Sequence, residues 1–139
     1  MPCLSASFKP AIGPIINVGV LPGGTFNPTE LPAKSPSVFP ALLDTGASVT
    51  CISSSVAQTG GLHAIGMRSM ASATHSIPVN VYLADLILPF GDAGYVTPSA
   101  QVMEFVPPPG GPFQILIGRD IICRGSLTMS FDGHFTFCL

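Results

Sequence analysis

Ala41-Leu42-Leu43-Asp44-Thr45-Gly46-Ala47-Ser48 is the most informative segment of this chain. Two branched apolar residues lead into an acidic residue, a small hydroxyl residue and a glycine. This order indicates a buried strand that ends in a tight loop and presents the carboxylate of Asp44. The plainer interpretation is a strand end with an ordinary turn, because Asp and Gly are common turn residues. This segment alone leaves both interpretations open.

A second segment, Ile115-Leu116-Ile117-Gly118-Arg119-Asp120, is another short apolar run that stops at a glycine. Ile121-Ile122-Cys123-Arg124 follows it and has helical character, ending at Gly125. Together and in this order, the two segments resemble motifs of the retroviral-type (retropepsin-like) aspartic proteases. Their Asp-Thr-Gly-Ala loop matches Asp44–Ala47, and their apolar-apolar-Gly-Arg-Asp/Asn segment matches Leu116–Asp120. The resemblance extends from about Gly13 to Phe131.

The resemblance implies an all-β fold: a closed or partly open β-barrel with one or two short helices, acting as a symmetric dimer. Residues 1–139 are expected to form a single protease subunit. Asp44 is then the catalytic residue. The expected supporting and binding residues fall into three groups: Thr45, Gly46 and Ala47 support the active-site loop; Ser48, Met67, Arg68, Ser69, Met70 and Leu116 bind substrate; Ile117, Gly118, Arg119 and Asp120 form a structural second motif.

Peptide hydrolysis without a metal or a nucleophilic side chain can use two carboxylates that hold one water. This chain has one Asp-Thr-Gly, and its other aspartates lack that context. The second carboxylate is therefore expected from Asp44 of another subunit across a two-fold axis. The sequence predicts an aspartic endopeptidase that cleaves extended apolar peptide segments. The alternatives are a non-catalytic dimeric module that holds a peptide by strand addition, and a piece processed from a precursor.

One position departs from the retroviral pattern. Ser48 stands where those enzymes commonly have an aspartate, which pairs with the arginine that matches Arg119. Arg119 is therefore expected to contact Asp120 or backbone carbonyl groups instead.

The segment between the motifs contains small residues from Gly66 to His75, which suit a hairpin tip. An exposed hairpin is the plainer interpretation, but the position matches the substrate-covering flap of the resembled family, with a tip at Met67–Ala73. Other elements follow from apolar alternation and from Pro, Gly and Ser content: strands at 15–20, 39–43, 49–52, 62–65, 77–88 and 100–106; a short helix at 53–59; loops at 21–40 and 107–112; and a C-terminal hairpin at 127–139 around Asp132-Gly133.

Composition excludes several classes of protein. Only 9% of residues are charged, the net charge is −2, and the five Lys and Arg residues are scattered, so no nucleic-acid footprint is expected. No uninterrupted apolar run is long enough to span a membrane, and no signal peptide is indicated. Neither the four cysteines nor the three histidines have metal-ligand spacing, so no metal or cofactor is expected. Reduced, buried thiols in a cytoplasmic protein are the prediction.

Overall fold

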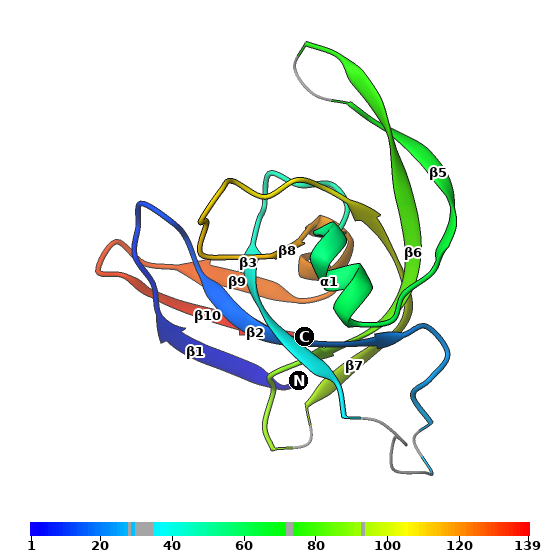
Figure 1. Ribbon diagram of the computed structural model, residues 1–139. Helices are drawn as coiled ribbons and strands as arrows, with labels where there is room; N and C mark the ends of the chain where they lie inside the picture. The colour runs from blue at the N-terminus through cyan, green and yellow to red at the C-terminus, as the bar shows by residue number, and fades with distance from the viewer. Residues whose placement is uncertain (28, 30–34, 72–73, 93) are drawn as a thin grey trace.

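The computed structural model describes residues 1–27, 29, 35–71, 74–92 and 94–139, and it is mostly β-structure (Figure 1). Two short helices accompany ten strands in these residues. The helices are α1 (Ser54–Thr59) and α2 (Arg119–Ile122). The strands are β1 (Cys3–Ser7), β2 (Ile15–Pro22), β3 (Ser37–Leu43), β4 (Cys51–Ile52), β5 (Ala64–Ala71), β6 (Ser76–Leu88), β7 (Tyr95–Glu104), β8 (Ile115–Ile117), β9 (Ser126–Met129) and β10 (His134–Cys138).

Six of the strands close into a barrel. They are hydrogen-bonded in the order β2-β3-β8-β4-β7-β6, and β6 pairs again with β2 to complete the ring. Closure leaves no free sheet edge in the barrel wall. The β-barrel with two short helices confirms the predicted fold class. Neither helix of the described residues is long and apolar enough to cross a membrane.

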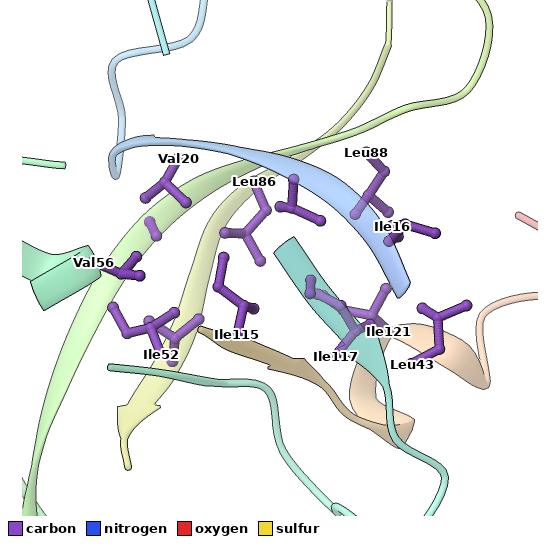
Figure 2. Packing of buried hydrophobic residues seen from close by; sticks show 14 of the residues in the cluster. Ile16, Val20, Leu43, Ile52, Val56, Leu86, Leu88, Ile115, Ile117 and Ile121 are labelled. Atoms are coloured by element: carbon purple, nitrogen blue, oxygen red, sulfur yellow. The ribbon is translucent and has the colours of Figure 1, made fainter. Parts of the chain in front are cut away.

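The barrel interior is filled by branched apolar side chains (Figure 2). Along β8, Ile115 and Ile117 are fully buried whereas Leu116 between them is only partly so. Successive side chains of a strand point to opposite faces, so Leu116 faces away from the core. Val56 of α1 and Ile121 of α2 are both buried in this cluster, so both helices pack on the barrel core. The strands that lead to Asp44 are therefore anchored in a close-packed core.

A second sheet holds the two ends of the chain together. β10 lies between β1 and β9, all antiparallel, and a disulfide joins Cys3 to Cys138. The predicted C-terminal hairpin is thus present as β9 and β10. The prediction of four reduced thiols is wrong for this pair, because pairing of β1 with β10 brings together two cysteines that are 135 residues apart. Cys51 is free and buried, and Cys123 is free but exposed.

Several predicted boundaries are also wrong. The loop expected at 21–40 is shorter, because β2 runs to Pro22 and β3 starts at Ser37; within this loop, residues 28 and 30–34 lie outside the described residues. The expected tip at 66–75 is mostly strand, since β5 continues to Ala71 and pairs with β6. Residues 72 and 73 of the predicted tip are not described. β7 runs from Tyr95 to Glu104 rather than over the predicted 100–106, and α2 begins at Arg119 rather than Ile121.

Asp85 organises the loop between β2 and β3. It is completely buried, and its carboxylate accepts hydrogen bonds from the backbone N–H groups of Gly24 (3.1 Å), Phe26 (2.7 Å) and Ser99 (2.8 Å). The register between β6 and β7 shifts at this point, and Ser99 has a φ of 47°. One buried carboxylate therefore fixes both the start of the loop and a bulge in the neighbouring strand.

Candidate active site

Asp44 lies where the parallel strands β3 and β8 end side by side. Its backbone N–H donates to the carbonyl of Ile117 (2.9 Å), which continues the pairing of the two strands by one residue. Beyond Asp44 the chain turns: Gly46 N–H donates to the Asp44 Oδ1 (2.9 Å), and Ala47 N–H donates to the Asp44 carbonyl (3.2 Å). Asp44 is half-buried, while Thr45 and Gly46 are exposed. The loop thus presents one carboxylate at the surface of the subunit.

Gly118 of the second motif is pressed against this loop. A Cβ at Gly118 would lie 2.6 Å from the carbonyl carbon of Val49, a distance that no real side chain tolerates. The Gly118 N–H donates to the hydroxyl of Thr50 (3.1 Å), and the Arg119 N–H donates to the carbonyl of Ala47 (2.9 Å). Glycine is required here because the two backbones are in direct contact.

Thr50 and Asp120 connect the motifs through side chains. The Asp120 carboxylate accepts from the Thr50 N–H (3.0 Å) and from the Thr50 hydroxyl (2.8 Å), and Oδ1 also accepts from the Ile121 N–H (3.0 Å). Thr50 is completely buried. The sequence analysis missed its role, although a hydroxyl residue among apolar neighbours was a usable signal. A buried hydroxyl requires a partner, and Asp120 supplies it.

Arg119 contacts a backbone carbonyl rather than Asp120. Its Nη1 donates to the carbonyl of Thr45 (2.8 Å). Of the two alternatives left open by the sequence, this is the second. Arg119 therefore fastens the exposed end of the loop, and Ser48 makes no pair with it that the structure describes.

A pocket of about 280 Å³ lies beside the loop. Its walls come from the loop, from β4 and β8, from the end of β5 and from the chain after β7. The lining residues are Gly46, Ala47, Ser48, Val49, Cys51, Met70, Ala71, Phe105 and Leu116. Most of these side chains are apolar, and Ser48 supplies a hydroxyl.

The predicted substrate-binding residues are divided between two places. Ser48, Met70 and Leu116 line the pocket beside Asp44. Met67 and Arg68 instead line a separate hollow of about 150 Å³ farther along β5. Ser69 is exposed between these two groups. The hairpin of β5 and β6 projects well beyond the barrel (Figure 1), and Met70 and Ala71, near its far end, are the hairpin residues that line the pocket beside Asp44.

Cys51 is a pocket residue that the sequence analysis did not select. Only 4% of it is exposed, and its Sγ donates to the carbonyl of Val49 at 3.5 Å. Burial, followed by the negative charges of Asp120 and Asp44, raises the pKa of the Cys51 thiol from 9.0 to about 11. The thiol is therefore neutral across the physiological range and serves as a small apolar wall.

Comparison with known proteins agrees with this geometry. The family model described as aspartyl protease matches residues 36–121, which include both motifs. The solved structures include a retropepsin-like aspartic protease from Rickettsia conorii, which is 13% identical and has a TM-score of 0.63; the match covers 97% of this chain and 89% of that one. This second similarity is one of fold. No curated protein matches the chain. Because the family model spans more than half of the sequence, the chain belongs to the aspartyl protease family.

Proposed function

We propose that two copies of this chain form an aspartic endopeptidase in which one water is held between the two Asp44 carboxylates. The single observation that carries the proposal is the exposed loop that presents Asp44 at the end of two parallel strands, beside a mostly apolar pocket. Gly46 N–H supports Oδ1. Among the described residues, none donates to Oδ2, which leaves it available for water.

The mechanism requires one ionised and one protonated carboxyl group. The ionised Asp44 takes a proton from the water as it attacks the scissile carbonyl, and the protonated Asp44 of the second copy donates to the carbonyl oxygen. The carbon becomes tetrahedral with two hydroxyl groups. The carboxyl group that took the proton from water passes it to the amide nitrogen, the C–N bond breaks and the amine leaves, while the other carboxylate takes a proton back from one hydroxyl as the product carbonyl forms. Cleavage should therefore follow a bell-shaped pH profile on the acidic side of neutral. A rate that rises steadily into alkaline pH would contradict the mechanism.

The proposed site needs a second carboxylate, so it needs a dimer, and Thr45 is placed to align the two Asp44 loops. Thr45 is exposed next to Asp44. A residue that contacts the partner's loop in the dimer has to be exposed in the isolated subunit. We infer that its hydroxyl bonds across the two-fold axis and aligns the loops. Gly46 keeps the backbone close to the carboxylate, and Ala47 keeps that side of the pocket small.

The pocket favours peptides with bulky apolar residues next to the cleaved bond. Leu116, Met70 and Val49 line it, and a charge buried against them would have no partner among the described lining residues. Leu116→Ala should raise KM and shift preference toward larger side chains. An unchanged peptide-library profile would show that this pocket does not hold the substrate.

Asp44→Asn tests the chemistry, and Asp92→Asn is the matched control because Asp92 is an exposed aspartate outside the pocket. Asp44→Asn should abolish cleavage of an apolar peptide library without changing the circular dichroism spectrum. Cleavage by Asp44→Asn at the wild-type rate would refute the assignment.

Mixing wild-type and Asp44→Asn chains tests the shared site. With equal amounts and random exchange, only about a quarter of dimers carry two Asp44 residues, so activity per wild-type chain falls by about half. Activity per wild-type chain that stays constant would mean that one chain suffices. Dilution gives an independent test, because specific activity should decline together with the dimer fraction measured by light scattering.

A further inference from the structure

A larger hollow, of about 480 Å³, lies against the hairpin of β5 and β6. Its volume falls within the range of roughly 300–1,000 Å³ that is usual for ligand pockets. The residues that carry the argument are Met70, Ile77, Pro78, Glu104, Phe105 and Val106. Met70 and Phe105 also line the pocket beside Asp44, so the two hollows share a wall. No residue of the Asp44 loop lines this larger hollow, which places it farther from the catalytic carboxylate.

The hollow is bordered by apolar side chains that are open to solvent. Val106 is 92% exposed and Ile77 is 47% exposed. Ile77 is paired with Met70 across β5 and β6, so the apolar surface continues from the shared wall onto the second strand of the hairpin. Exposed apolar surface of this kind, continuous with a binding pocket, indicates a place where another chain packs.

One charged group lies in this apolar setting. The half-buried Glu104 lines the hollow, and its Oε1 accepts a hydrogen bond from the Tyr82 hydroxyl (2.7 Å), which also accepts a longer bond from the Asn80 amide (3.5 Å). These bonds orient the carboxylate. No cationic side chain among the described residues pairs with Glu104, since the ion pair in that part of the chain joins His134 and Asp132. The second oxygen of Glu104 is therefore available to a cation from outside.

We propose that this hollow is a substrate subsite for a lysine or arginine side chain. The aliphatic stem would pack on Ile77, Phe105 and Val106, and the cationic head would meet Glu104, since long basic side chains readily bury their stems while keeping their heads polar. The inference rests on the proposed endopeptidase function, because the occupant is part of the same extended peptide.

The register follows from strand geometry. Side chains two residues apart on an extended peptide point to the same side, at a separation of roughly 7 Å. Because the hollow shares a wall with the Asp44 pocket, neighbouring same-side positions fit the pair, and the residue in the hollow would be two positions farther from the cleaved bond than the residue in the Asp44 pocket. Substrates would combine apolar residues at the cleaved bond with one basic residue at this outer position.

The test uses peptides that are identical except at the outer position, which carries Lys, Arg, norleucine or Glu. Binding to the Asp44→Asn protein is measured by fluorescence anisotropy at low salt, so that the readout does not depend on cleavage. Norleucine has the length of a lysine stem without the charge. The Lys and Arg peptides should bind about 3- to 5-fold more tightly than the norleucine peptide, as for a partly exposed ion pair, and the Glu peptide should bind most weakly.

Glu104→Gln, introduced into the Asp44→Asn protein, should reduce the ratio of Lys to norleucine affinity to about one. Glutamine still accepts a hydrogen bond from the Tyr82 hydroxyl but carries no charge. Adding Asp92→Asn instead, which removes an exposed charge elsewhere, should leave the ratio unchanged. The ratio should also fall with added salt. Norleucine binding as tightly as Lys, an unchanged ratio in Glu104→Gln, or an equal loss in Asp92→Asn would each overturn the subsite.

Failure of this inference and failure of the proposed function give different results. An active wild-type enzyme with no basic preference at any position contradicts the subsite alone. A protein that binds the Lys peptide preferentially through Glu104 but never cleaves it supports the subsite and contradicts the protease.

Discussion

Replacing Asp85 by alanine should destabilise the subunit strongly without touching the active-site loop. The substitution leaves three backbone N–H groups, those of Gly24, Phe26 and Ser99, without their acceptor. An unsatisfied buried donor costs about 1–3 kcal/mol. Because the loop can relax and admit some water, we expect a net loss of about 3–5 kcal/mol, which is a large part of the roughly 5–15 kcal/mol that stabilises a typical domain.

The measurement is urea unfolding followed by far-UV circular dichroism, since the chain has no tryptophan. With a denaturant slope of about 2 kcal/mol per molar urea, the midpoint should fall by about 1.5–2.5 M. Asp85→Asn retains one acceptor oxygen and should lose about half as much. Asp92→Asn, at an exposed position, should stay within about 0.5 kcal/mol of wild type. A midpoint for Asp85→Ala within about 0.25 M of wild type would refute the role assigned to this carboxylate.

Four further predictions concern the contacts around the site and the chain ends. Gly118→Ala should cost about 1–3 kcal/mol and lower kcat/KM, because its methyl group would force the two motifs apart; an unchanged melting temperature would contradict the close contact. Cys51 should be alkylated about 100-fold more slowly at pH 8 than a thiol of pKa 9.0, and its rate should rise up to pH 11, while the exposed Cys123 reacts readily; mass spectrometry distinguishes them. Because the folded Cys51 keeps its proton to higher pH than the unfolded one, its contribution to stability is complete below pH 9 and is lost between pH 9 and about 11. Reducing the Cys3–Cys138 disulfide should lower the free energy of unfolding by about 2–5 kcal/mol, and equal urea midpoints with and without reductant would argue against it.

The sequence predicted the parts of the structure that depend on local pattern. The apolar runs before Asp44 and before Gly118 became β3 and β8. The short helix expected at 53–59 became α1, with the Ser53 hydroxyl accepting a hydrogen bond from the Val56 N–H. In each case the side chains that mark the element are within a few residues of one another.

The elements that were missed depend on distant partners. β1 consists mostly of small residues with weak strand preference, and it is a strand because it pairs with β10 at the other end of the chain. Gly66 and Ala71 also have low strand preference, yet β6 holds them in β5. The clustering of Thr50 with Asp120 and the burial of Asp85 arise in the same way, since their partners are 14 to 70 residues away. The hydroxyl of Thr50 among apolar neighbours was a local signal, but no local pattern identifies the distant partner of a side chain.

The bond between Cys3 and Cys138 makes nearly the whole oxidised chain a covalent ring. A single cut anywhere inside the ring, for example in the loop between β2 and β3, would produce two new ends but release no fragment. Self-cleavage or accidental nicking would therefore leave one band on a non-reducing gel and appear as two only after reduction. The nicked molecule would keep its strand pairings and its original ends, and it would gain a second pair of chain ends at the cut.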